Sequence, residues 1–321
     1  MEFSKPFFFG KINDIIYTQG MVVMEKIKSE NKKTIIIEDA NKTYIRKYKR
    51  QHITDYPKQI PIGTTMKLVN SSKVYAPKIL KEKRKYIDLE YITGKNIDQA
   101  LDRKNLVDTI IDYIVSLQNI DYRKLNRYIN WKNNNEYFNY LISFLGKLKK
   151  SFTNNTKIII ELLNIGDEEL DKLKNYKIDN HRKMALINRN ISYDNILLKF
   201  NRIYILNWEY ATYGDIAHEL STHFLFINYT EEEKKYILEI LSKKLNISLT
   251  RLKKDIIIYT TYEYLNKVYN EINNLTKKIK KNEIIKSDLK DLYHYYINLA
   301  KLLEIKALPF NEIEEIFKRI K

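Results

Sequence analysis

The chain has 321 residues, of which 44% are hydrophobic, and it carries a formal net charge of +17 and no cysteine. The lack of cysteine excludes a disulfide framework, a thiolate metal site and a cysteine nucleophile. No apolar run approaches the ~18 residues of a membrane-spanning helix, so we expect a cytoplasmic protein without a membrane span.

Residues 1–93 are predicted to form a mostly β N-terminal lobe. Residues 34–38 and 43–48 are rich in β-branched and aromatic side chains, and they predict two strands joined by a turn. A short helix is predicted within residues 59–69, and a further strand is predicted over residues 83–92.

The rest of the chain, residues 94–321, has the apolar spacing of helices. Helices are predicted over residues 106–117, 137–148, 251–275 and 287–305. Thr230 and Glu233 fit a capping box that begins another helix. A β-rich N-lobe followed by a helical C-lobe predicts an α+β, two-lobed architecture.

Two neighbouring segments carry the most specific pattern in the chain. Residues 187–198 place Asn188, Asn190 and Asn195 in the spacing of the loop H-x-D-x-x-x-x-N, with Asn at the positions of His and Asp. Residues 206–221 begin with Leu-Asn-Trp-Glu-Tyr-Ala and end with Gly-Asp-Ile-Ala-His-Glu-Leu-Ser. Together the two segments resemble the catalytic loop and metal-binding segment of the aminoglycoside and choline phosphotransferase-like kinase superfamily, in its spore-coat kinase-like branch.

This resemblance covers about residues 184–226, and residues 86–94 resemble the superfamily's strand and hinge between the lobes. It implies a protein-kinase-like fold with ATP and Mg²⁺ as cofactors. It also implies that Lys47 contacts the phosphates of the nucleotide and that Glu90 and Ile92 line its site.

By the same resemblance, Asn195 matches the metal-binding Asn, whereas Asn207 stands in place of the metal-binding Asp. Asn190 stands at the position of the general base. An amide nitrogen cannot accept a proton, and Mg²⁺ favours carboxylate oxygens over neutral amides. We therefore predict an inactive base position and a weakened metal site.

An active enzyme of this kind also needs a Lys on the phosphates, paired with a Glu from the following helix. Arg46 and Lys47 lie on opposite faces of one strand, so only one of them can point into the cleft, and we predict Lys47. Thr64 or Thr65 stands where the helix Glu is expected, and only Gly20 lies in the region that would cover the phosphates. These changes predict a pseudokinase that binds a nucleotide or a protein partner.

Three neighbouring acidic residues are candidates to replace the missing carboxylates. Asp194 adjoins Asn195, but adjacent side chains in a turn point apart. Glu209 and Asp215 match positions that we interpret as structural, because they would hold the loop by hydrogen bonds.

Two alternatives remain open at this point. The chain could be an active ATP-dependent kinase that phosphorylates a hydroxyl of an aminoglycoside, choline or a sugar, with acceptor specificity in residues 130–180 and 250–305. It could instead be a basic protein that binds nucleic acid or an anionic surface. Its densest basic run, residues 277–281, lacks interleaved aromatic residues, and the Lys excess also fits A+T-rich codons spread over solvated faces.

The segment from His218 to His223 resembles the zinc-protease motif H-E-x-x-H but is one residue too long. Two residues at i and i+5 lie roughly 140° apart on a helix, so both histidines cannot bind one metal. We expect both to pack within the helix that follows Asp215.

Overall fold

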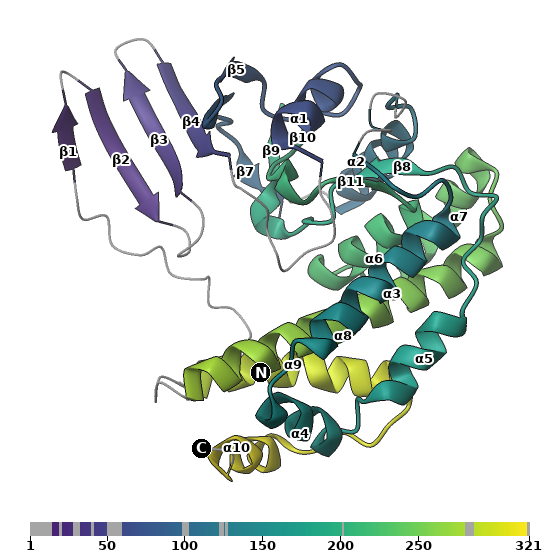
Figure 1. The fold of residues 1–321 in the computed structure, drawn as a ribbon. Coiled ribbons are helices and arrows are strands. Elements are labelled where there is room, and N and C mark those ends of the chain that lie inside the picture. Colours follow the sequence, from purple (N-terminus) through teal and green to yellow (C-terminus); the bar gives the residue numbers. More distant parts are fainter. Residues whose placement is uncertain are drawn as a thin grey trace.

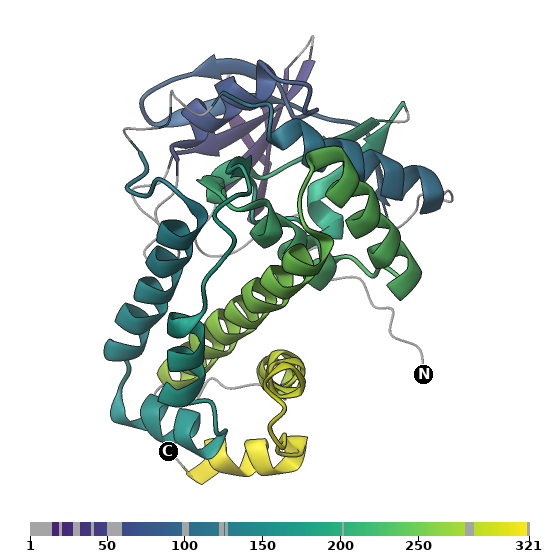
Figure 2. The same cartoon turned by 90° about the vertical axis from the view of Figure 1, so that its right-hand side faces the viewer.

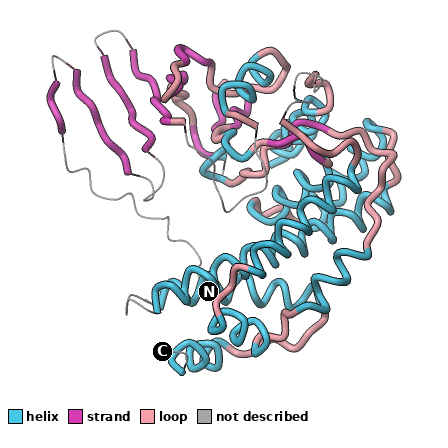
Figure 3. Tube along the Cα trace, in the orientation of Figure 1, coloured by secondary structure: helices cyan, strands magenta, loops and turns pink. Residues whose placement is uncertain are grey.

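The computed structural model describes residues 15–18, 21–27, 33–39, 42–49, 60–97, 103–121, 125, 128–200, 202–279 and 286–319. A β-sheet built from the N-terminal part lies to one side of a large helical part (Figures 1 and 3). The predicted α+β, two-lobed architecture is confirmed. The predicted roles of Gly20 and of Lys280 and Lys281 fall outside the described residues.

The N-terminal sheet has six antiparallel strands in the order β1-β2-β3-β4-β6-β5. Their bounds are β1 Ile15–Thr18, β2 Met21–Ile27, β3 Lys33–Asp39, β4 Lys42–Tyr48, β5 Ile79–Glu82 and β6 Tyr86–Glu90. The β3–β4 hairpin and β6 confirm the predicted strands, whereas β5 was not predicted. The predicted short helix is α1, Ile62–Asn70, which buries Met66 and Val69 in the same core as Ile87 of β6.

The register of the sheet decides which way Arg46 and Lys47 of β4 point. Arg46 lies opposite Asp88 on β6, and Lys47 lies opposite Ile87. Ile87 is fully buried in the core that α1 covers. Because side chains alternate along a strand, Lys47 shares this inner face while Arg46 lies on the outer face.

The helical part contains nine long helices among the residues that the structure describes. Their bounds are α2 Arg103–Leu117, α3 Asn134–Lys150, α4 Asn154–Leu162, α5 Asp167–Asn175, α6 Ile216–Phe226, α7 Glu231–Leu245, α8 Leu249–Ile279, α9 Lys286–Leu303 and α10 Phe310–Arg319. The predicted capping box of Thr230 and Glu233 begins α7. The predicted helices are confirmed, while α4, α5 and α10 were not predicted.

The longest helix, α8, runs diagonally through the helical part in the second view (Figure 2). It buries one side, including Leu252, Tyr259 and Tyr269, at the spacing of a single helix face. It packs against both α6 and α9. The last turn of α8 carries Lys277 and Lys278, so this part of the basic run lies at a helix end, as expected.

Two small sheets hold the segments that resemble a kinase active site. One has the order β10-β9-β7, from β7 Lys95–Asn96, β9 Ile196–Lys199 and β10 Arg202–Ile205. The other pairs β8 Ala185–Ile187 with β11 Thr212–Gly214. Short 3₁₀ turns, η3 Tyr193–Asn195 and η4 Trp208–Tyr210, complete the path. Most residues of the two motifs therefore lie in the segment between β8 and β11, two strands that pair with each other.

None of the described helices combines the length and the apolar character needed to span a bilayer.

Candidate functional site

The loop after β8 is held by backbone and side-chain hydrogen bonds rather than by its own secondary structure. The backbone amides of Asn188 and Arg189 both donate to Oε2 of Glu219 at 3.0 Å. The Arg189 guanidinium donates to the carbonyl of Tyr210 at 2.8 and 2.9 Å. Oδ1 of Asn188 accepts from the backbone amide of Asn190 at 2.9 Å. Asn188, at the usual His position, thus fixes the loop's shape.

Three asparagines of the motifs meet in what we call the amide cluster: Asn190, Asn195 and Asn207. Nδ2 of Asn195 donates to the backbone carbonyl of Asn190 at 2.7 Å. Nδ2 of Asn207 donates to Oδ1 of Asn195. The two predicted metal-binding side chains therefore hydrogen-bond to each other. Asn207 has a left-handed backbone, with φ of 53°.

Lys47 reaches the amide cluster from β4. Its Nζ donates to Oδ1 of Asn207 and to Oε1 of Glu209, each at 2.5 Å. The side chains of Lys47 and Glu209 are only 12% and 17% exposed, so the pair is largely removed from water. The carboxylate of Glu209, which we interpreted as structural, pairs with Lys47.

Arg46, the other basic residue of β4, is occupied elsewhere. Its guanidinium forms a two-pronged ion pair with Asp88 at 2.7 and 2.9 Å and lies 4.1 Å from the centre of the Tyr86 ring. The hydrogen bonds that Arg46 donates to Asp88 raise the pKa of Arg46 above its ordinary value. Of the two candidates, Lys47 is the one that faces the motif residues.

The helix after β4 offers no carboxylate to Lys47. Thr65 of α1 is fully buried, and its Oγ1 has no hydrogen-bond partner among the described residues. Thr64 bonds to the hydroxyl of Tyr128 at 3.3 Å. The ion pair that a helix Glu would make is made here by Glu209, from the opposite side of the cleft.

The other predicted residues lie near the hinge or at the surface. Glu90 ends β6, and its carboxylate accepts from the backbone amide of Lys78 at 3.2 Å. Ile92 is buried in the core. Asp194 is exposed while Asn195 is buried, so the two neighbours point apart, as expected.

The donor set at the amide cluster does not fit Mg²⁺ well. Asn195 and Asn207 supply only neutral amide oxygens, and those two oxygens already accept hydrogen bonds from Asn207 and Lys47. Within the described part of the chain, no group of three or more His, Cys, Asp or Glu side chains could hold a metal. The ammonium group of Lys47 supplies a positive charge beside Asn207.

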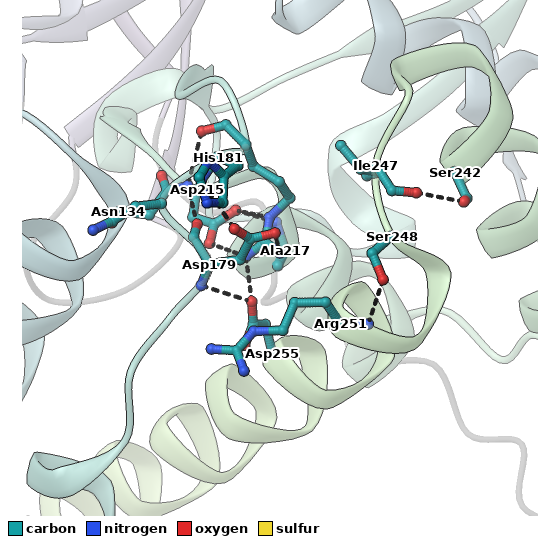
Figure 4. A network of polar contacts seen from close by, with 12 residues as sticks. Asn134, Asp179, His181, Asp215, Ala217, Ser242, Ile247, Ser248, Arg251 and Asp255 are labelled. Atoms are coloured by element: carbon teal, nitrogen blue, oxygen red, sulfur yellow. Dashed lines mark hydrogen bonds and ion pairs between the residues drawn. The ribbon is translucent and has the colours of Figure 1, made fainter.

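Beneath the loop lies a second polar group, which we call the ionic network: Asp179, Arg182, Asp215 and Asp255 (Figure 4). Arg182 donates to Asp215 at 2.6 and 3.0 Å and to Asp255 at 2.6 Å. Oδ1 of Asp215 also accepts from the backbone amide of Ala217 and so caps α6. The structural role expected for Asp215 is confirmed.

The charges of the ionic network compensate one another. Burial lowers the pKa of Arg182, but the carboxylates of Asp215 and Asp255 outweigh it and raise that pKa above its ordinary value. Asp255 also accepts from the hydroxyl of Tyr176 at 2.9 Å and from the backbone amide of Asp179 at 3.1 Å. Every one of these buried charges therefore has partners, as a stable buried ion pair requires.

Both histidines of α6 are fully buried, as expected. Nε2 of His218 lies 2.6 Å from Oε1 of Glu263 on α8, and Nδ1 lies 2.7 Å from the hydroxyl of Tyr137. The ring nitrogens of His223 have no hydrogen-bond partner among the described residues, and burial lowers the pKa of His223 to about 3. Burial raises the pKa of the nearby Glu219.

A pocket of about 200 Å³ opens beside Asn190. The loop contributes Arg189 and Asn190, and α8 contributes a polar face that includes Glu263, Lys267 and Glu271. Sequence reasoning placed acceptor specificity broadly over residues 250–305 but missed these side chains. Their signal in the sequence, charged residues spaced by one helical turn, is common to any solvated helix face.

The chain is similar to proteins of known structure, although its sequence matches no family model. No protein-family model and no curated protein matches the chain. Among solved structures, the aminoglycoside phosphotransferase APH(4)-Ia is similar with a TM-score of 0.61 and 11% identity, over 92% of this chain and 95% of that one. A thermostable mutant of that enzyme was solved in a ternary complex with AMP-PNP and hygromycin B.

A choline kinase and an ethanolamine kinase are similar as well. The choline kinase LicA from Streptococcus pneumoniae has a TM-score of 0.58 and 16% identity, over 88% of this chain and 93% of that one. An ethanolamine kinase from Plasmodium vivax has a TM-score of 0.55 and 11% identity, over 93% and 83%. The chain therefore has the two-lobed kinase-like fold shared by aminoglycoside phosphotransferases and choline and ethanolamine kinases.

Proposed function

We propose that the chain is a pseudokinase of this fold, which keeps the nucleotide cleft and acts by binding a nucleotide or a protein partner. Phosphoryl transfer depends on carboxylates that hold Mg²⁺ and accept the proton of the attacking hydroxyl. Asn207 and Asn190 occupy those positions. The amide of Asn190 cannot accept the proton, and the neutral amide of Asn207 is a weaker ligand for Mg²⁺ than a carboxylate.

One observation carries the proposal: the Lys47 ammonium bonds to both Asn207 and Glu209 at 2.5 Å. In an active kinase the corresponding region must bring a metal ion to the phosphates. Here neutral amides replace the charge that would attract a metal, and the amide oxygens of Asn195 and Asn207 already accept hydrogen bonds, from Asn207 and Lys47. A nucleotide would then be held by the Lys47 ammonium without any requirement for Mg²⁺.

The proposal is tested by titrating ATP into the purified protein by calorimetry, with and without Mg²⁺. We expect ATP to bind with an affinity that Mg²⁺ does not increase. We also expect the protein to produce ADP from ATP no faster than buffer alone does. The variant Lys47→Met should weaken ATP binding by about tenfold, equivalent to roughly 1.4 kcal/mol.

Lys49→Met is the matched control for that variant. Lys49 lies one residue beyond β4 and pairs with Glu82 at 2.6 Å. Its replacement therefore also removes one positive charge, but from a place that does not contact Asn207. We expect its affinity for ATP to stay within about twofold of the wild type. ADP production that Asn195→Ala abolishes would contradict the proposal.

A second candidate function, an active small-molecule kinase, is favoured by the pocket beside Asn190. The Glu263 carboxylate lines the same pocket, and its hydrogen bond with His218 lowers the pKa of Glu263 despite the opposing effect of burial. Loss of a general base typically slows a reaction by roughly 10²–10⁴-fold rather than abolishing it. Slow ADP release that depends on Mg²⁺ and on an added alcohol would support this candidate over the pseudokinase.

A further inference from the structure

The pocket beside Asn190 contains a lysine surrounded by groups that attract cations. Nζ of Lys267 lies 4.7 Å from the ring centre of Phe226, at the end of α6, and 5.1 Å from that of Tyr295 on α9. Glu263 and Glu271 lie one helical turn before and after it on α8. Two of these elements, α6 and α9, pack directly against α8, so the arrangement is fixed by the helical core.

Aromatic faces combined with carboxylates form the kind of cage that binds an ammonium group. In this chain the cage already holds an ammonium of its own. Burial lowers the pKa of Lys267, and the charges of Glu263 and Glu271 oppose that change. An incoming amine would have to displace Lys267 or approach it as a like charge, which is unfavourable in a partly desolvated site.

The rest of the pocket is suited to hydroxyl groups. Asn190, Asn266, Asn270 and Asn274 line it, and each amide can both donate and accept a hydrogen bond. Asn266 is already held in place, since its oxygens accept from Nδ2 of Asn270 at 2.8 and 3.0 Å. The volume of about 200 Å³ is below the roughly 300–1,000 Å³ typical of sites for drug-sized ligands. A ligand no larger than a monosaccharide is therefore favoured.

We propose that this pocket takes a neutral polyhydroxylated ligand, a monosaccharide or cyclic polyol, and that Lys267 determines this specificity by filling the cation cage. The inference deepens the proposed function, because it names a ligand class for the pocket next to the altered catalytic loop. It does not depend on nucleotide binding, which uses Lys47 on the other side of Asn190.

The test compares neutral sugars with their amino counterparts. Saturation-transfer NMR and calorimetry would measure binding of glucose and glucosamine and of galactose and galactosamine, with myo-inositol as a further neutral polyol and choline as a further cation. We expect at least one neutral member to bind the wild type, and to bind at least about tenfold more tightly than its amine counterpart. Lys267→Met, which keeps the length and packing of the side chain, should abolish or reverse this preference.

Lys253→Met is the matched control, since Lys253 is an exposed residue of the same helix. It should leave the preference unchanged. Asn274→Ala, also exposed on α8, should weaken the neutral ligand without unfolding the chain. A melting curve for each variant separates lost binding from lost structure.

Two results would overturn the inference. One is an amine that binds the wild type at least as tightly as its neutral counterpart, or no binding by any neutral member of the panel. The other is an unchanged preference in a folded Lys267→Met protein. Failure of the proposed function looks different, because it would appear in the Mg²⁺ dependence of ATP binding and leave the sugar preference intact.

Discussion

The amide cluster and the ionic network support neighbouring parts of the same segment but differ in chemistry. In the ionic network, Arg182 pairs with Asp215 and Asp255, and each of these buried charges has a partner of opposite sign. In the amide cluster, the carboxylates expected of an active enzyme are replaced by Asn190 and Asn207. The ionic network keeps its carboxylates, whereas the amide cluster has amides where an active enzyme would have carboxylates.

This contrast shows that the shape of the cleft and its chemistry have separate physical bases. The loop is shaped by Glu219, Arg189 and Asn188, none of which needs to touch a metal. A kinase-like cleft can therefore persist after its catalytic carboxylates are gone. Four predictions test this contrast between the ionic network and the amide cluster.

The largest effect is expected in the ionic network. Asp215→Asn would leave Arg182 with a partly uncompensated buried charge and would weaken the cap of α6. Breaking a buried ion pair costs about 3–5 kcal/mol, and we expect a loss of that size in the free energy of unfolding, measured by urea denaturation. Asp171→Asn, at an exposed pair with Lys174, should cost under about 1 kcal/mol. Equal effects of the two variants would remove the distinction drawn here.

The next effect is a pH dependence within α6. His223 has a pKa of about 3 in the fold, below its ordinary value of 6.5, so between these values the unfolded chain binds the proton more readily. Stability must therefore fall as the pH falls below about 6.5. Between pH 7.5 and pH 5 this group should contribute a loss of about 2 kcal/mol.

The variant His223→Leu isolates that contribution. Glu219 nearby has a raised pKa, so its own effect on stability has the opposite sign, but it is present in both proteins. The difference between wild type and His223→Leu in free energy of unfolding should therefore grow from pH 7.5 to pH 5, in favour of the variant. A difference independent of pH would mean that burial does not lower the pKa of His223 in the fold.

A smaller effect is expected when charge is returned to the amide cluster. Asn207→Asp would place a carboxylate beside Lys47 and Asn195, and Mg²⁺ should then tighten ATP binding by about tenfold, or 1.4 kcal/mol. Asn246→Asp is a close control, because Asn246 has a similar left-handed backbone (φ of 51°) but lies exposed at the end of α7. Calorimetry that shows no Mg²⁺ dependence in Asn207→Asp would indicate that more than this charge has been lost.

The smallest effect concerns the helix that lacks its Glu. The Oγ1 of Thr65 is buried without a partner among the described residues, so Thr65→Val removes an unsatisfied group at nearly constant volume. We expect a gain of up to about 1 kcal/mol in the free energy of unfolding. Thr64→Val, which loses the contact with Tyr128, should give no gain.

Much of the fold follows from local patterns in the sequence. The alternation in β3 and β4 and the capping box of α7 depend on neighbours in the chain, and both were predicted correctly. By contrast, β5 has the sequence Ile-Leu-Lys-Glu and forms only because β6 pairs with it. Such a strand is defined by its partner rather than by its own residues.

The site shows the same division. The resemblance to kinase motifs placed Asn190, Asn195 and Asn207 in one region, because only a short hairpin separates the two motifs. The partner of Lys47 lies 162 residues away at Glu209, and alternation could not choose between Arg46 and Lys47 without the register to β6. The pocket face of α8 depends on the packing of α6, α8 and α9, which no local pattern encodes.

The left-handed backbone at Asn207 limits which residues mutation can place there without strain. Asparagine and aspartate are among the few residues other than glycine that adopt this conformation readily. Their codons differ at one base, so Asn190 and Asn207 each stand a single point mutation away from aspartate. The backbone is already set for either side chain at Asn207. A change of Asn207 to aspartate is therefore a short genetic step that the local backbone accommodates.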